Sequence, residues 1–117
     1  RRNRMRVCGT RFYNIYRTKD GKAYFIFRYV LINYYNPGFY EVDILSQPSY
    51  NGRDGDASVS HRLPSDRPDC SKKICIYNSR APKDLQSAMK ISADWAELTH
   101  KYIKTGITID EQIRRRS

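Results

Sequence analysis

The chain has 117 residues, the length of one domain, and 39% of them are hydrophobic and 13% aromatic. That much apolar material can form one core, which excludes a disordered chain, and no apolar run approaches the ~20 residues of a membrane helix. The formal net charge is +10 at pH 7, which favours an anionic partner.

The first half of the chain is predicted to form an antiparallel sheet. Residues 11–18 are aromatic and β-branched, as in a strand, and the Asp20-Gly21 pair that follows is a strong hairpin signal. Residues 23–33 are nearly continuous in apolar character, which suits a central strand covered on both faces.

Residues 39–46 alternate between apolar and acidic side chains, which predicts a half-buried strand and completes a meander. Tyr40, Val42 and Ile44 lie on one side of this strand, and Glu41 and Asp43 lie on the other. Beyond a polar loop, residues 58–63 and 73–77 are each expected to form a short strand.

The C-terminal part of the chain has the period of a helix, which we expect over residues 83–105. Pro82 suits the start of this helix, Lys101 and Lys104 suit its last turn, and Gly106 suits its end. Apolar residues recur at steps of three and four, at Leu85, Ala88, Ile91, Trp95, Leu98 and Tyr102. Residues 107–113 are expected to add a short strand or turn.

These elements predict an α+β fold, an antiparallel β-meander of four or five strands with one long C-terminal helix packed on one face. We divide the chain into a basic N-terminal arm at residues 1–6, a single domain at residues 7–113 and a basic C-terminal tail at residues 114–117.

Most of the excess positive charge lies at the two ends of the chain, and short basic arms attract polyanions such as nucleic acid without choosing a sequence. Further arginines are interleaved with aromatic residues in the predicted strands, a pattern that can bind single-stranded bases and their phosphates. The alternative is that the terminal arginines only keep the chain in solution and that the aromatic residues form the core. The candidate nucleic-acid-binding residues are Arg1, Arg2, Arg4, Arg6, Arg11, Arg17, Arg28, Arg114, Arg115 and Arg116.

The cysteines are few and odd in number, at Cys8, Cys70 and Cys75, and no apolar stretch follows the arginine-rich start as in a secretory signal. Both features favour a reducing, cytoplasmic location over a disulfide framework. Cys70, Cys75, His61 and His100 could be zinc ligands, but the Cys-x4-Cys spacing of Cys70 and Cys75 is looser than that of typical zinc sites. We expect no metal and no cofactor.

The order of motifs resembles a family of small bacterial proteins of unknown function. The shared features are an aromatic sheet region, an Ile-Leu-x-Gln-Pro-x-Tyr segment at residues 44–50, the His61-Arg62-Leu63 element, the Ile74-Cys75 element and a Trp-Ala-x-x-Thr-x-x-Tyr-Ile helix from Trp95. The resemblance implies a bacterial or mobile-element origin and brings no activity with it.

The chain also resembles, more faintly, the ubiquitin-conjugating (E2-like) fold. In both, a meander is followed by a Pro-x-Tyr segment (Pro48 to Tyr50), a turn with a histidine (His61), an Ile-Cys strand (Ile74-Cys75) and a helix entered through a proline (Pro82). The resemblance implies that Cys75 is a thioester nucleophile and that His61 belongs to the supporting turn. His-Arg-Leu stands here in place of the His-Pro-Asn of that family, so the resemblance also fits a degenerate relative.

Three functions therefore stay open. The first is a small cytoplasmic binding module of bacterial or phage origin that docks on an anionic partner, either nucleic acid or an acidic protein, with no membrane involved. The second is an E2-like thiol enzyme, or its degenerate relative, that uses Cys75. The third is a structural or oligomeric subunit.

Overall fold

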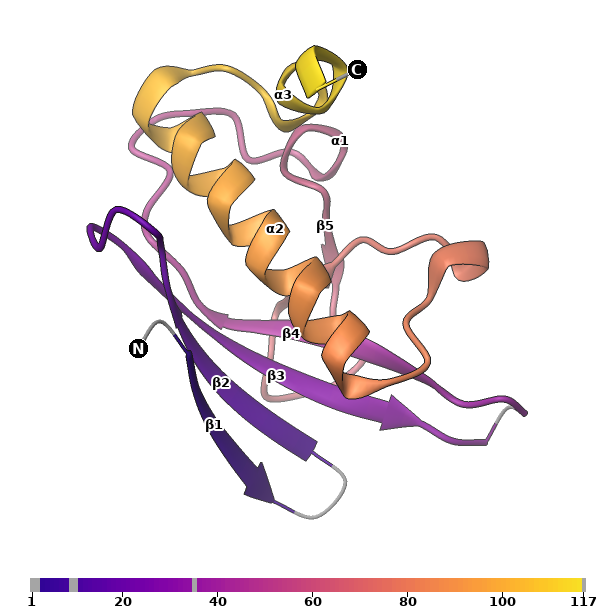
Figure 1. Ribbon diagram of the computed structural model, residues 1–117. Coiled ribbons are helices and arrows are strands. Elements are labelled where there is room, and N and C mark those ends of the chain that lie inside the picture. The colour runs from indigo at the N-terminus through magenta and orange to yellow at the C-terminus, as the bar shows by residue number, and fades with distance from the viewer. Residues whose placement is uncertain (1–2, 9–10, 35, 117) are drawn as a thin grey trace.

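A six-stranded antiparallel sheet and one long helix dominate the computed structural model, which describes residues 3–8, 11–34 and 36–116. The strands are β1 (Asn3–Cys8), β2 (Arg11–Arg17), β3 (Tyr24–Ile32), β4 (Phe39–Ser46), β5 (Arg62–Pro64) and β6 (Lys72–Ile74), in the order β1-β2-β3-β4-β6-β5. The helices are α1 (Ala57–Ser60), a 3-10 turn η1 (Asn78–Arg80), α2 (Leu85–Thr105) and α3 (Ile109–Arg116). The expected α+β fold is confirmed, and Figure 1 shows α2 lying across one face of the sheet.

The core lies between this face and α2. Phe25 and Phe27 on β3 are fully buried, and the Trp95 ring meets each of them edge-on, at 5.8 and 6.1 Å between ring centroids. Asp84 accepts a hydrogen bond from the backbone N–H of Ser87 and caps the start of α2. The bounds predicted for this helix are therefore confirmed to within two residues.

β1 begins in the segment that the sequence assigns to a basic arm, residues 1–6. Its backbone pairs with β2 along its whole length, from Asn3 opposite Tyr16 to Cys8 opposite Arg11. Residues 3–6 thus belong to the sheet, and β1 adds a strand to the expected four or five. Charged residues are common in edge strands, where they discourage pairing with another chain. The basic composition of this segment therefore did not distinguish the strand β1 from an arm outside the sheet.

The end of the chain is helical, which corrects the short strand or turn expected at residues 107–113. Thr108 Oγ1 accepts the backbone N–H of Glu111 at 3.2 Å at the start of α3, and buried Ile109 joins the core. Gln112 Nε2 donates to the carbonyl of Leu98 at 3.0 Å and fastens α3 to α2. The expected tail is the last turn of α3, where cationic side chains favour the negative end of the helix dipole.

The region between β4 and α2 also differs from expectation. Residues 57–60 form α1, and His61 ends it in the left-handed conformation, with φ 56°, before β5 begins. The strand expected at residues 73–77 is β6, which ends at Ile74, so Cys75 lies just beyond it. Short polar segments of this kind carry too little periodicity to separate a helical turn from a strand.

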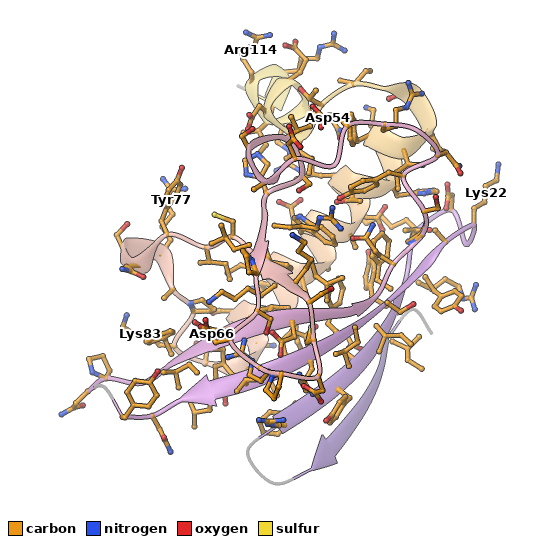
Figure 2. The ribbon with its side chains drawn as sticks, turned by 180° about the vertical axis from the view of Figure 1, so that it is seen from behind. Lys22, Asp54, Asp66, Tyr77, Lys83 and Arg114 are labelled. Atoms are coloured by element: carbon orange, nitrogen blue, oxygen red, sulfur yellow. The ribbon has the colours of Figure 1, made fainter. Side chains whose placement is uncertain are left out.

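The sheet face away from α2 carries a buried ion cluster, defined by Arg28, Asp43 and Arg67. Arg28 Nη2 lies 2.9 Å and Arg67 Nη2 lies 2.7 Å from oxygens of Asp43, which is fully buried. The loop between β5 and β6 supplies Arg67 and covers this part of the sheet (Figure 2). The acidic side of β4 therefore faces a packed layer, which corrects the solvent-facing side predicted from its alternation.

Hydrogen bonds set the ionisation of the cluster. Burial alone would raise the pKa of Asp43, but hydrogen bonds from Arg67, Ser65 and Arg28 outweigh it and hold the pKa below its usual range. Arg28 also donates to Asp69 at 2.7 and 2.8 Å and lowers the pKa of that carboxyl to about 2. The cluster is thus fully charged at neutral pH.

Candidate anion-binding site

A hollow of about 590 Å³ lies where the turn between β2 and β3 meets the C-terminal half of α2 and α3. We call it the basic groove, after the cationic residues that line it: Lys19, Lys101, Lys104, Arg115 and Arg116. The turn is held by the backbone N–H of Thr18, which donates to the carbonyl of Ala23 at 2.9 Å, and by the positive φ of Gly21. The hairpin turn therefore places Lys19 beside the helices α2 and α3.

The carboxylates in the basic groove are already engaged. Asp20 accepts hydrogen bonds from the backbone N–H of Lys22 at 2.9 Å and from His100 Nε2 at 2.8 Å. With the Thr18 hydroxyl, these bonds lower the pKa of Asp20 below its usual value. Glu97 accepts the backbone N–H of Lys19 at 2.9 Å and the hydroxyl of Tyr16. Both acids brace the hairpin against α2 and leave the groove with an excess of cations.

The cations of the basic groove differ in their partners. Lys19 and Lys101 are exposed, and neither side chain has an ion-pair partner among the residues that the structure describes. Arg115 Nε pairs with Glu111 at 2.9 Å and Arg116 Nη2 with Asp94 at 2.7 Å. Exposed pairs of this kind contribute about 0–1 kcal/mol, so an anionic partner can compete for both arginines.

A second hollow, of about 530 Å³, adjoins the basic groove and shares His100 and Lys104 with it. We call it the tyrosine hollow, because Tyr24, at the start of β3, is half exposed in its wall. Lys22 lines the same hollow and projects from the turn into open space (Figure 2). The turn between β2 and β3 thus separates two hollows that both carry positive charge.

The structure brings together only some of the arginines that the sequence nominates. Arg115 and Arg116 line the basic groove, and Arg114, which pairs with Glu111, projects from the exposed side of α3 (Figure 2). Arg11 and Arg17 lie on β2, and Arg17 is exposed.

Arg28, which the sequence also nominates, is not accessible to a ligand, because only 2% of it is exposed and its guanidinium is held by Asp43 and Asp69. Its Nε, Nη1 and Nη2 all donate to these two carboxylates, so the guanidinium is not available to a phosphate. Arg4 and Arg6 lie in β1, and Arg1 and Arg2 lie outside the described residues.

Sequence reasoning missed the lysines of the site. Lys101 and Lys104 have a helical spacing that places them on one face, but we interpreted them as residues that end α2. Lys19 and Lys22 flank the Asp-Gly turn, where polar residues are common in any hairpin. No local signal joins these two pairs, because they meet only when the hairpin packs on α2.

The residues of the thiol hypothesis line a different groove, of about 260 Å³, between the end of β6 and the helices α2 and α3. The backbone N–H of Cys75 donates to the carbonyl of His61 at 2.8 Å, and His61 Nε2 lies 2.8 Å from Asp110 Oδ1. Cys75 is partly exposed, and Trp95 and Ile109 form apolar walls. The structure thus places Cys75 and His61 together and adds Asp110 from α3, which the sequence did not nominate.

Cys70 lies apart from this groove, because its thiol lies 3.1 Å from the carbonyl of Lys72 and it lines a separate hollow with Pro68. Among the side chains that the structure describes, no three His, Cys, Asp or Glu residues are gathered so that they could hold a metal ion. Over the same described residues, no helix has both the length and the apolar character needed to span a membrane.

Comparison of the chain with protein-family models, curated proteins and solved structures gives no match.

Proposed function

We propose that this protein is a small cytoplasmic binding module that docks on an anionic partner, nucleic acid or an acidic protein, through the basic groove. The observation that supports the proposal is the meeting of Lys19, Lys101, Arg115 and Arg116 around one hollow whose carboxylates are already hydrogen-bonded. A concave surface with one sign of charge raises the local concentration of ions of the opposite sign. The cytoplasmic location is supported by the free thiols of Cys70 and Cys75.

Docking of this kind works by exchange of ions. Each phosphate or carboxylate that meets a lysine or arginine of the groove releases a counterion, so binding weakens steeply as salt is added. Lys19 and Lys101 have no internal ion pair to give up among the described residues, whereas Arg115 and Arg116 must each exchange a surface pair. The two lysines should therefore contribute most to the affinity.

The test is a charge-reversed variant, Lys19→Glu with Lys101→Glu, in a titration of labelled DNA and of poly-glutamate at about 50 and 200 mM salt. We expect the double variant to bind at least about tenfold more weakly and to show a smaller salt dependence. The matched control is Lys83→Glu with Lys90→Glu, which changes the net charge equally at exposed positions outside the groove. Equal loss in both double variants would show that bulk charge, and not the groove, carries the binding.

A second candidate function is an enzyme that uses Cys75 as a nucleophile. It is favoured by the groove that Cys75 and His61 both line and by the contact of His61 with Asp110. The carboxylate of Asp110 can orient the imidazole of His61, an arrangement that suits activation of a neighbouring nucleophile. The two functions make opposite predictions for a Cys75 variant, because the enzyme would lose its activity whereas the binding module would keep its affinity.

A further inference from the structure

Tyr24 combines features that a purely ionic site does not need. It is 50% exposed although it begins the central strand β3, and it lines the tyrosine hollow beside Lys22 and Lys104. Pro48 and Ile103 supply apolar wall to the same hollow. An exposed aromatic residue in a hollow that two lysines also line can contact the flat, apolar part of a ligand while the lysines contact its charged part.

The basic surface continues from Tyr24 onto the sheet. Tyr24 pairs in register with Arg17 on β2, and directly opposed residues of an antiparallel pair point to the same side. The Arg17 guanidinium lies 3.4 Å from the carbonyl of Gly21, along the turn that carries Lys22. Ile15, two residues before Arg17 and 39% exposed, extends the apolar part of this face.

The chemistry of this surface separates the classes of anionic partner. An acidic polypeptide presents carboxylates, which the negative face of an aromatic ring repels. A DNA duplex keeps its bases stacked inside, so only its phosphates could reach the lysines. A single strand presents unpaired bases that stack on an aromatic ring and phosphates that bind the neighbouring cations.

We propose that the tyrosine hollow binds single-stranded nucleic acid, with one base stacked on Tyr24 and the adjoining phosphates on Lys22, Lys104 and Arg17. This inference rests on the proposed function and names the partner class for it. Asn51, exposed at the same hollow, offers an amide to the edge of the stacked base. The basic groove on the other side of the turn then receives the continuing backbone of the strand.

The experiment compares the full-length protein with Tyr24→Leu and Tyr24→Phe. The probes are labelled oligo(dT) of about 12 nucleotides, a duplex of equal length and poly-glutamate. We expect Tyr24→Leu to weaken oligo(dT) binding about tenfold and Tyr24→Phe to stay within about twofold of the wild type. Neither variant should change the affinity for the duplex or for poly-glutamate.

Tyr77→Leu is the matched control, because Tyr77 is 75% exposed and lies on the opposite side of the molecule from Lys22 (Figure 2). A second readout uses the unaltered protein: ultraviolet crosslinking to oligo(dT), followed by mass spectrometry, should modify Tyr24. Circular dichroism and thermal unfolding of each variant establish that it is folded.

Two results overturn the inference and differ in what they leave standing. Equal binding of single strand and duplex, with no effect of Tyr24→Leu and no crosslink at Tyr24, rejects the stacking site but keeps the basic groove as a docking surface. Failure of every polyanion to bind rejects both the stacking site and the proposed function.

Discussion

Arg28 and Asp43 occupy paired positions in β3 and β4, and Arg28 Nη2 lies 2.9 Å from Asp43 Oδ2 with both side chains almost fully buried, at 2% and 0% exposure. This pair has a structural consequence, because the loop between β5 and β6 closes over it through Arg67 and Asp69. The pair also has a functional consequence. It buries Arg28, the arginine in the middle of the aromatic strand β3, so that this charge is not at the surface.

The buried ion cluster should make Asp43 a critical residue for stability. In Asp43→Asn, Arg28 and Arg67 lose the carboxylate that they share, and both charges stay buried without full compensation. Breaking a buried pair from one side typically costs about 3–5 kcal/mol of unfolding free energy. Urea unfolding followed by circular dichroism measures the loss.

Asp66→Asn is the control for that experiment, because Asp66 is 75% exposed and, among the described residues, forms an ion pair with Lys73 alone, at 3.2 Å. We expect a change of no more than about 1 kcal/mol for this surface pair. Similar losses in the two variants would mean that the cluster does not hold the sheet and the loop together.

Stability should fall in acid because of the same cluster. The pKa of Asp43 lies below its usual range and that of Asp69 is lowered to about 2, whereas both carboxyls have a pKa of about 3.9 in the unfolded chain. A depressed pKa in the folded state contributes stability that is present above the unfolded value and lost as the pH falls toward the folded value. The free energy of unfolding should therefore be level from about pH 7 to 5 and decline below about pH 4.

Urea unfolding at a series of pH values checks this dependence. Asp69→Asn should be less stable than the wild type near neutral pH and should decline less steeply in acid, because it no longer gains a proton on unfolding. A wild-type profile that stays level down to about pH 2 would contradict the role assigned to these carboxylates.

The ends of the hairpin turn and of α2 require glycine. Gly106 has φ 80° and Gly21 has φ 73°, in the left-handed region that alanine enters at a cost of about 1–2 kcal/mol. Gly106→Ala and Gly21→Ala should each lose about 1 kcal/mol in thermal unfolding. A Cβ at Gly106 would also lie 2.8 Å from Arg53 Nη1, whereas no atom of the described residues lies within 4 Å of a Cβ at Gly21, so Gly106→Ala should lose slightly more.

Cys75→Ala separates the two candidate functions. The basic groove does not include Cys75, so this variant should bind DNA and poly-glutamate with wild-type affinity and salt dependence. Its thermal unfolding should change little, because Cys75 is only partly buried. The thiol enzyme would instead be favoured if the wild type formed a covalent adduct and both Cys75→Ala and His61→Ala failed to form it.

The sequence predicted those parts of the fold that depend on neighbouring residues. The 3.6-residue period, Pro82 and Gly106 predicted nearly the observed bounds of α2, because the hydrogen bonds of a helix join residues only four positions apart. The Asp20-Gly21 turn likewise predicted the hairpin of β2 and β3. The sequence could not reveal α3, because its apolar face is short and is fixed by contacts of Ile109 and Gln112 with distant residues.

By itself, then, the sequence determined the α+β class, the long helix, the meander and the excess of positive charge. Only the tertiary structure decided which charges are available. Arg28 and Arg67 form buried ion pairs with Asp43. Lys19 and Lys101, which are distant in the sequence, line one groove. The physical reason is that secondary structure follows from local hydrogen bonds and periodicity, whereas a charged side chain is buried or exposed according to the partners that packing places beside it.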